Sequence, residues 1–168
     1  MRNIYLIGMM GAGKTATGKA LADLAAMDFL DLDGEIESET HQSINEIFLK
    51  KGESFFRAEE KRILRRAAGQ TNTVVATGGG VILDPENVET MRATGQVIYL
   101  AAPLEILWKR VRGKQDRPLL RASDPQTLFF ELFRKRGPLY EAASHGKIDT
   151  EDLAPEAAAR WIIERYLK

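Results

Sequence analysis

The stretch that most constrains this chain is GMMGAGKT at residues 8–15. It fits the pattern GxxxxGK followed by Ser or Thr, an apolar run at residues 3–7 precedes it, and Leu21, Leu24 and Ala25 follow it at helical spacing. Glycines permit a tight loop whose backbone N–H groups point inward at phosphate oxygens, and the following helix adds its positive N-terminal end. The stretch therefore predicts a phosphate-binding loop for a nucleoside triphosphate.

The parts of this loop have different expected tasks. Lys14 is expected to reach the terminal phosphates of ATP, and the Thr15 hydroxyl can ligate Mg²⁺. The residues expected to line the phosphates are Gly11, Ala12, Gly13, Lys14, Thr15 and Ala16. The loop identifies only the phosphate donor, because switches, motors and small-molecule kinases all use it. The acceptor must be inferred from the rest of the chain.

Apolar runs and helical spacings alternate along the chain. Short apolar runs predict strands at residues 3–7, 29–32, 73–76, 96–100 and 147–149. Helical spacing predicts helices at residues 14–26, 43–49, 53–68, 84–92, 104–111, 125–135 and 155–167. Strand followed by helix is the order of a parallel sheet with helices on both faces. We therefore expect a single domain over residues 1–168, with a three-layer α/β/α fold around a five-stranded parallel sheet.

The composition disfavours several classes of function. The 168 residues contain 24 basic and 24 acidic side chains, so no overall field draws the chain to nucleic acid or to an anionic membrane. Cysteine is absent, which excludes disulfides and thiolate metal sites and suits a reducing compartment. The apolar run at residues 4–10 is too short to span a membrane. We expect a cytoplasmic protein, by default a monomer, without nucleic-acid or membrane partners.

Two aspartates in the segment DLD close the second predicted strand. The period of two along a strand places Asp31 and Asp33 on the same side of the sheet edge where the phosphates are expected. One carboxylate could orient hydrated Mg²⁺ while the other takes a substrate hydroxyl. Because phosphoryl transfer is mostly positioning and charge stabilisation, Asp33 is expected to align the hydroxyl more than to deprotonate it. Taken alone, the segment could also be a polar turn.

Four further features are ambiguous when each is taken alone. Arg57 in FFRAEE could be an exposed helix arginine held by Glu60, and Arg136 could be a solvated charge at a helix end. The glycines at residues 78–80 could form a flexible turn, but three in a row beside a buried strand end allow backbone to approach a ligand closely. Arg117 lies in a long irregular segment, where an arginine could close on transferring phosphate and exclude water.

Together these features resemble the shikimate kinase family over nearly the whole chain. The matching segments are GMMGAGKT at 8–15, FLDLDGEIE at 29–37, SINEIF at 43–48 with GESFFRAEE at 52–60, VVATGGGVIL at 74–83, DRPLL at 116–120 and RGPLY at 136–140. The phosphate loop is shared widely, but its combination with the other segments is specific. The resemblance implies a P-loop kinase fold with a lid at about residues 112–124 and an acceptor-binding helical segment at about residues 33–61.

The resemblance also implies roles for individual residues. It assigns carboxylate binding to Arg57 and Arg136 with Gly78, Gly79 and Gly80 alongside, the substrate hydroxyls to Asp33, Mg²⁺ to Thr15 and to Asp31 through water, and the lid position beside the phosphates to Arg117. Two planar guanidinium groups suit one carboxylate, and an aspartate suits a hydroxyl. The expected catalytic residues are Lys14, Asp33 and Arg117.

One segment departs from the family pattern. Family members often present a basic residue against the adenine, before the proline that follows the last strand, but here the segment reads DTEDLAPE at residues 149–156. Acidic and apolar side chains stand where a basic one is expected, while Pro155 is retained. The adenine contact is therefore expected to fall on Arg110 or Arg112 and on backbone.

The leading hypothesis is an ATP- and Mg²⁺-dependent kinase acting on shikimate. It would transfer the γ-phosphate to the 3-hydroxyl, giving shikimate 3-phosphate in aromatic amino-acid (chorismate) biosynthesis. Another small hydroxy-acid kinase, such as gluconate kinase, is an alternative that the FFR and TGGG segments disfavour. A nucleotide-binding module without turnover is a second alternative, which the intact set of Lys14, Asp31, Asp33 and Arg117 disfavours.

Overall fold

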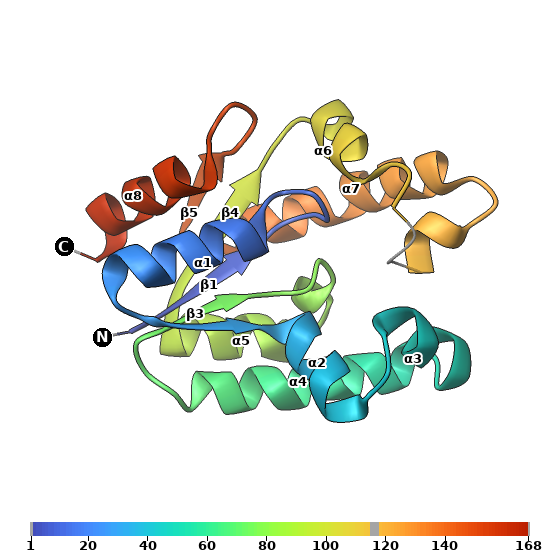
Figure 1. Cartoon of the computed structure of the whole chain (residues 1–168), viewed down its shortest axis with the longest axis horizontal. Coiled ribbons are helices and arrows are strands. Elements are labelled where there is room, and N and C mark those ends of the chain that lie inside the picture. The colour runs from blue at the N-terminus through green and yellow to red at the C-terminus, as the bar shows by residue number, and fades with distance from the viewer. Residues whose placement is uncertain (1, 115–117, 168) are drawn as a thin grey trace.

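A computed structural model describes residues 2–114 and 118–167 of the chain. Its centre is one sheet of five parallel strands in the order β2, β3, β1, β4, β5 (Figure 1). The strands are β1 (Asn3–Ile7), β2 (Asp28–Asp31), β3 (Thr73–Ala76), β4 (Gly95–Ala101) and β5 (Gly146–Asp149). The strands expected from the sequence are thus confirmed, with ends that differ by one residue at most.

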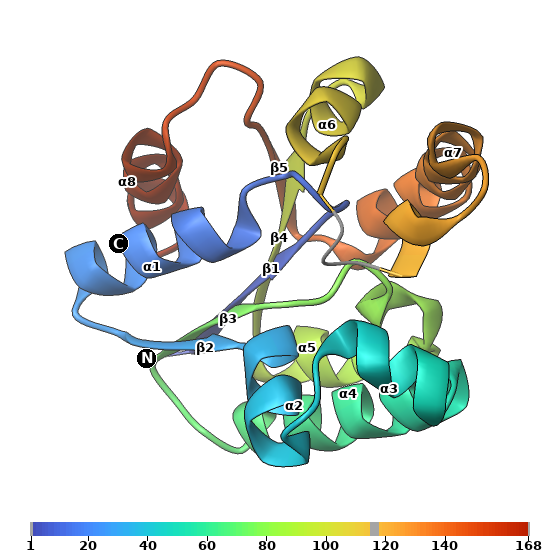
Figure 2. The same ribbon diagram turned by 45° about the vertical axis from the view of Figure 1, so that its right-hand side comes forward.

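Helices cover both faces of this sheet. They are α1 (Lys14–Ala25), α2 (Leu32–Thr40), α3 (Ile44–Lys50), α4 (Glu53–Ala68), α5 (Pro85–Thr94), α6 (Leu104–Val111), α7 (Pro125–Ala143) and α8 (Pro155–Tyr166), with the short 3-10 helices η1 (Val81–Leu83) and η2 (Pro118–Arg121). Helices α1 and α8 lie together on one face, and α4, α5 and α7 lie on the other (Figure 2). The expected three-layer α/β/α fold is confirmed.

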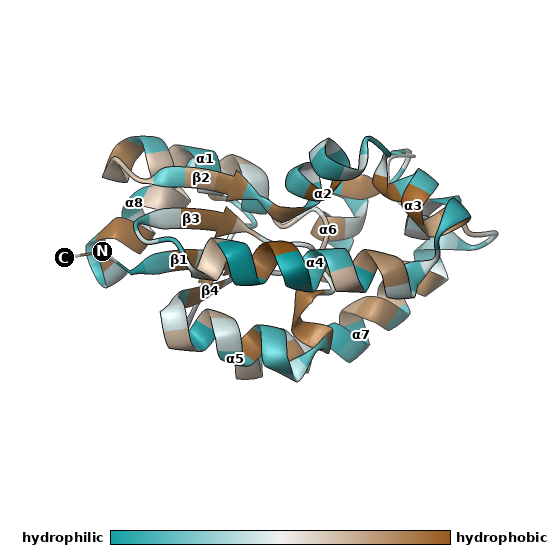
Figure 3. Ribbon diagram, turned by 90° about the horizontal axis from the view of Figure 1, so that it is seen from below, coloured by the Kyte–Doolittle hydropathy of each residue, from teal (hydrophilic) through white to brown (hydrophobic). Residues whose placement is uncertain are grey.

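The core lies between the sheet and its two helical layers. All residues of β1 and β3 are buried, and their sequences NIYLI and TVVA are the nearly continuous apolar runs of strands covered on both faces. Figure 3 shows brown, hydrophobic strands behind helices α4 and α5, which alternate between brown and teal along their length. Among the described residues, no helix has the length and apolar content needed to cross a membrane.

The strand order brings three connections to one edge of the sheet. Strand β1 lies between β3 and β4, so the chain leaves β1 at the point where the strand order reverses. Leu6 of β1 pairs with Ala76 of β3, and Ala76 pairs with Asp31 of β2, so these strands end at about the same level. Ligands of open parallel sheets bind at such a point. The phosphate loop, the DLD segment and the glycine run therefore leave the sheet side by side.

Strand β2 ends one residue earlier than expected, and a helix follows it without a connecting loop. Asp31 ends β2 and caps α2, because its carboxylate accepts hydrogen bonds from the N–H groups of Asp33 (3.1 Å) and Gly34 (3.3 Å). Leu32 and Ile36, four residues apart, are fully buried and hold α2 in place. The expectation that strand periodicity places Asp31 and Asp33 on one side is therefore wrong, since Asp33 lies in the first turn of a helix.

Helix α7 runs well beyond the helix expected at residues 125–135. It continues through Gly137 and Pro138 to Ala143. A proline inside a helix removes a backbone hydrogen bond and costs about 3 kcal/mol. Tyr140 is fully buried and Ala143 is nearly so, and this burial offsets the cost. The alternative that Arg136 is a solvated charge at a helix end is consequently wrong, because the helix continues past it.

The segment expected to form a lid, residues 112–124, includes η2. This short helix lies against α3 and against α7. Its chain then enters α7 at Asp124, whose carboxylate accepts a hydrogen bond from the Thr127 N–H at 3.1 Å. Arg117 falls at residues 115–117, outside the described part of the chain.

Asn3 joins the sheet to the end of α4 through a buried amide. Its Nδ2 donates to the carbonyl oxygens of Gln70 (2.9 Å) and Ala67 (3.3 Å), and its Oδ1 accepts from the Thr73 N–H (3.1 Å). Asn3→Asp leaves two carbonyls facing a buried carboxylate, so we expect the free energy of unfolding to fall by about 2–4 kcal/mol. Urea denaturation measures this change. Gln126→Glu, which makes the same amide-to-carboxylate change at an exposed position of α7, is the control, and equal losses in both variants would contradict the role of the Asn3 amide.

Candidate active site

Three glycines shape the phosphate loop at residues 8–13. Gly8, Gly11 and Gly13 have φ angles of 145°, 85° and 88°, in a region that side-chain-bearing residues rarely adopt. A Cβ at Gly8 would also overlap the carbonyl oxygen of Leu100. Gly13 precedes α1 and supplies no capping side chain, so the first N–H groups of α1 are directed at the loop. This arrangement matches the helix end at which the sequence predicts anion binding.

Lys14 lies across this loop. Its Nζ donates hydrogen bonds to the carbonyl oxygens of Gly8 (2.9 Å) and Met9 (3.0 Å). The Met9 carbonyl also accepts a bond from the Ala12 N–H at 3.1 Å, which closes the loop. The ammonium group is thus held where a phosphate cradled by the loop would meet it.

Thr15 and Asp31 meet beside the loop. The Thr15 hydroxyl donates a hydrogen bond to Oδ2 of Asp31 at 2.6 Å. The other oxygen of Asp31 is occupied by capping α2. The carboxylate is therefore fixed by two elements, and one of its oxygens faces the start of α1.

The glycine run at residues 78–80 is the meeting point of side chains from α2 and α4. A Cβ on Gly78 would lie 3.0 Å from Oδ1 of Asp33 and 2.8 Å from Oε2 of Glu60. A Cβ on Gly80 would overlap the guanidinium of Arg57. None of these glycines has a positive φ, so glycine is needed here for close approach rather than for backbone conformation.

A third helix reaches the same run through Gly79. A Cβ on Gly79 would lie 3.5 Å from Nη1 of Arg136 and 3.6 Å from the hydroxyl of Tyr140, both on α7. The structure therefore brings Asp33, Arg57 and Arg136 together around three consecutive glycines. Two guanidinium groups, the carboxylate of Asp33 and the Arg57-paired carboxylate of Glu60 therefore lie at the end of β3, next to the phosphate loop.

Arg57 is held by a buried acid. Its Nη1 donates to Oε1 of Glu60 at 2.8 Å, and its Nε and Nη2 contact Oε1 of the exposed Glu53 at 3.3 Å. The side chain of Glu60 is 1% exposed while that of Arg57 is 26% exposed. Burial raises the pKa of Glu60, and the adjacent Arg57 charge acts in the opposite direction. The pair is therefore no surface ion pair, because Glu60 fixes one edge of the guanidinium.

A family model for shikimate kinase matches residues 10–167 of the chain. The chain belongs to the shikimate kinase family. A shikimate kinase of Persephonella marina is 44% identical over 165 residues, which cover 98% of this chain and 99% of that protein.

Solved structures of shikimate kinase family members agree with this assignment. The shikimate kinase from Acinetobacter baumannii in complex with shikimate is 40% identical, with a TM-score of 0.94 over 98% of this chain and 92% of that one. The shikimate kinase from Bacteroides thetaiotaomicron is 33% identical, with a TM-score of 0.88 over 97% of each chain. The family has an ATP-dependent kinase activity, so this chain is assigned as an enzyme of that class.

Arg110 contacts the backbone of the phosphate loop. Its Nη1 donates to the Gly11 carbonyl at 3.2 Å, and its Nη2 donates to the carbonyls of Thr150 (2.8 Å) and Glu151 (3.0 Å). It therefore ties the loop to the segment between β5 and α8. Pro155, at the start of α8, follows that segment.

Two residues of the site, Glu60 and Tyr140, were not predicted from the sequence. Glu60 appears in the sequence analysis only as a partner of an exposed Arg57. Glu60 nevertheless lies on the apolar stripe of α4 with Phe56 and Ile63. An acid on a buried stripe is a signal for a paired, buried charge. Tyr140 appears in the sequence analysis only as part of the segment RGPLY at 136–140, and its position depends on packing between α7 and η1 that no local pattern encodes.

Proposed function

We propose that this chain transfers the γ-phosphate of ATP to the 3-hydroxyl of shikimate, giving shikimate 3-phosphate in aromatic amino-acid (chorismate) biosynthesis. The observation that carries the proposal is the convergence of Asp33, Arg57 and Arg136 on the glycine run beside the phosphate loop. Two cationic forks and one carboxylate match a small acid that carries ring hydroxyls. The Acinetobacter baumannii relative, whose structure contains shikimate, supports the choice of acid.

ATP would bind along the phosphate loop and the start of α1. The N–H groups from Gly11 to Ala16 would hold its phosphates, and Lys14 would exchange its two loop carbonyls for the terminal phosphates. Arg110 and Pro155 would border the adenine, since both adjoin the segment that Arg110 ties to the loop. This placement uses the Arg110 stem and the backbone in place of a basic side chain at residues 151–153.

Mg²⁺ fits the residues beside the loop. The Thr15 and Asp31 oxygens, 2.6 Å apart, are hard donors of the kind this ion prefers. Within the described residues there is no group of three His, Asp or Glu side chains that could hold a metal ion on its own, which suits an ion held mainly by phosphates and water. Thr15 would ligate the ion and Asp31 would orient one of its waters. When bound, Mg²⁺ neutralises charge on the phosphates.

The acceptor would lie over the glycine run. Its carboxylate would take paired hydrogen bonds from Arg57 and Arg136, and Asp33 would accept a hydrogen bond from the ring hydroxyl that attacks. Asp33 would thereby orient the ring hydroxyl so that a lone pair of its oxygen points toward the γ-phosphate. Asp33 would receive the hydroxyl proton as the new P–O bond forms and the bond between the γ-phosphorus and the ADP oxygen breaks. Positioning by three fixed side chains is the main contribution of the acceptor side.

Residues 112–124 would close over the reacting phosphates and bring Arg117 to them, which would exclude water from the transfer. The contact of η2 with α3 supports a lid that meets the acceptor-binding segment. We also propose a single-domain cytoplasmic protein, in line with the absence of cysteine, and a monomer by default. The balance of 24 basic and 24 acidic residues suits a chain without nucleic-acid or membrane partners.

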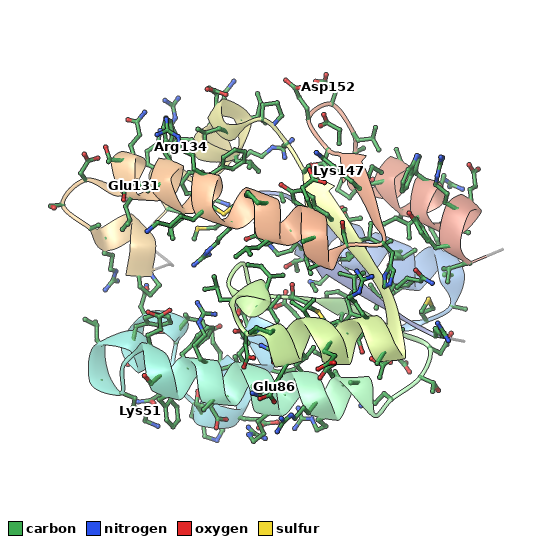
Figure 4. The ribbon with its side chains drawn as sticks, turned by 180° about the vertical axis from the view of Figure 1, so that it is seen from behind. Lys51, Glu86, Glu131, Arg134, Lys147 and Asp152 are labelled. Carbon is green, nitrogen blue, oxygen red and sulfur yellow. The ribbon has the colours of Figure 1, made fainter. Side chains whose placement is uncertain are left out.

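Arg136→Lys tests the carboxylate clamp. Lysine keeps the charge but loses the planar fork, so we expect the Michaelis constant (KM) for shikimate to rise about tenfold or more while the KM for ATP changes less than about twofold. Steady-state kinetics measure both constants. Arg134→Lys, on the outer surface of the same helix (Figure 4), is the control. Unchanged kinetics in Arg136→Lys would remove Arg136 from the clamp.

Gly80→Ala tests the close approach of Arg57 to backbone. The added Cβ overlaps the Arg57 guanidinium while the φ of Gly80, −101°, suits alanine. The arginine must therefore shift, and we expect the KM for shikimate to rise about tenfold in a protein that remains folded. Gly137→Ala, in open space next to Arg136, should leave that constant unchanged. Steady-state kinetics of the two variants measure the KM for shikimate. A wild-type KM in Gly80→Ala would contradict the placement of Arg57 against the backbone of Gly80.

A further inference from the structure

Tyr140 contacts the glycine run although the proposed reaction gives it no task. Its hydroxyl donates a hydrogen bond to the carbonyl oxygen of Gly79 at 2.5 Å. The side chain is fully buried, and its ring stacks on that of Tyr99 with centroids 5.1 Å apart. Burial raises the pKa of the Tyr140 hydroxyl well above its ordinary range, so the group stays a donor at neutral pH.

This hydrogen bond fixes the direction of one peptide group. The Gly79 carbonyl and the Gly80 N–H belong to the same peptide, and the described residues contain no cis peptide bond. In a trans peptide the C=O and N–H point in opposite directions. Holding the Gly79 carbonyl toward Tyr140 therefore turns the Gly80 N–H away from it.

The other carbonyls of the run are also engaged. Gly78 accepts a bond from the Val81 N–H at 3.3 Å, and Gly80 accepts one from the Leu83 N–H at 3.1 Å. Within the described part of the chain, the N–H groups of Gly79 and Gly80 donate to no protein atom. With its carbonyls held by protein, the run has free N–H groups left to offer an anion, which is the arrangement of an anion-binding backbone concavity.

Tyr140 also adjoins the guanidinium of Arg136. The two residues are four apart on α7, so their side chains lie on one face of the helix. Both approach Gly79, with Nη1 of Arg136 and the Tyr140 hydroxyl 3.5 Å and 3.6 Å from the same Cβ position. Nε of Arg136 is buried, and among the described residues it has no hydrogen-bond partner. One hydroxyl thus borders the peptide and the arginine together.

We propose that Tyr140 is a positioning residue for the acceptor: its hydroxyl fixes the Gly79–Gly80 peptide next to Arg136, so that the Gly80 N–H and the Arg136 guanidinium present their donors to one carboxylate. This inference rests on the proposed function, since the carboxylate is that of the acceptor acid. It explains why a tyrosine, rather than another buried aromatic residue, faces Gly79. The bond leaves the transferring phosphate untouched, so Tyr140 acts through binding of the acid.

Tyr140→Phe in the full-length chain tests the proposal. We expect the KM for shikimate to rise about tenfold, while the turnover number (kcat) and the KM for ATP change less than about twofold. An acceptor in which a hydroxymethyl group replaces the carboxylate should bind wild type and Tyr140→Phe about equally. Tyr99→Phe serves as the control and should keep the wild-type KM for shikimate. It removes the hydroxyl of the ring stacked on Tyr140, and that hydroxyl makes no hydrogen bond to the glycine run among the described residues. A merely structural role would weaken both acceptors alike.

A second measurement on the wild-type protein does not depend on the stability of the variant. Titration with shikimate should shift the amide proton resonance of Gly80 downfield in an NMR spectrum, because that N–H gains a carboxylate partner. An unshifted Gly80 resonance, or a wild-type KM for shikimate in folded Tyr140→Phe, would overturn the positioning role. Failure of wild-type protein to turn over shikimate would instead overturn the proposed function.

Discussion

Lys14→Met will lower turnover with ATP by about a hundredfold or more. Methionine has a similar length and no charge, so the loop can keep its shape while the terminal phosphates lose their cation. The positive φ angles of Gly8, Gly11 and Gly13 set that shape independently of Lys14. The loss should appear mainly in kcat, because the lysine charge counts most when charge moves to the leaving oxygen in the transition state.

The control for this prediction is Lys19→Met, which makes the same change at an exposed position of α1. ADP release at saturating ATP and shikimate measures both variants. Lys19→Met should retain wild-type turnover. If Lys14→Met retained it as well, the phosphate loop would not be the donor site.

Asp33→Asn will reduce kcat by about a hundredfold or more while the KM for ATP stays within about twofold. The amide keeps the size of the side chain but lacks the charge that draws the hydroxyl proton and aligns the oxygen. Asp33 lies beside Gly78, and the cap of α2 depends on its backbone N–H rather than on its side chain. The fold should therefore survive the substitution.

Substitutions of two nearby aspartates, Asp28 and Asp31, distinguish the possible causes of a lower kcat in Asp33→Asn. Asp28→Asn changes an exposed residue at the other end of β2 and should leave kinetics unchanged. Asp31→Asn weakens the oxygen pair with Thr15 and should raise the Mg²⁺ concentration needed for half-maximal rate. Kinetics at several Mg²⁺ concentrations distinguish the three variants. Equal losses in Asp31→Asn and Asp33→Asn, both rescued by Mg²⁺, would contradict a separate role for Asp33.

Much of the fold could be predicted from local patterns. The buried strands are near-continuous apolar runs, and the phosphate loop lies between one such run and a helix, so the sequence predicts both the parallel sheet and the place in it where the proposed donor site lies. The bounds of α4 and α6 agree with the expected ranges, since α4 lies between Gly52 and Gly69 and α6 begins after Pro103. These features depend on neighbours along the chain.

The errors arise where distant contacts decide the structure. Asp31 serves as both strand end and helix cap, and that choice moves Asp33 from a strand to the first turn of α2. Pro138 locally favours the end of a helix, but α7 continues beyond it because Tyr140 is buried. Both errors come from tertiary packing that overrides local propensity.

The acceptor side could be predicted only through the joint pattern of its residues. Arg57 and Arg136 each resemble surface charges in isolation, and they meet because α4 and α7 both approach the run at residues 78–80. Spacing alone predicts the pair of Arg57 with Glu60 but not the burial of that acid, since the same spacing occurs on exposed helix faces. Close approach of backbone, which the glycines allow, is the feature that joins them.

The central claim is that one site transfers phosphate from ATP to shikimate. ADP release by purified protein with ATP and Mg²⁺, compared between shikimate, gluconate and no acceptor, tests it most directly. We predict strong ADP release with shikimate and only background release with gluconate or without acceptor. Release with gluconate alone, or background release in every case from a protein that binds ATP, would contradict the claim.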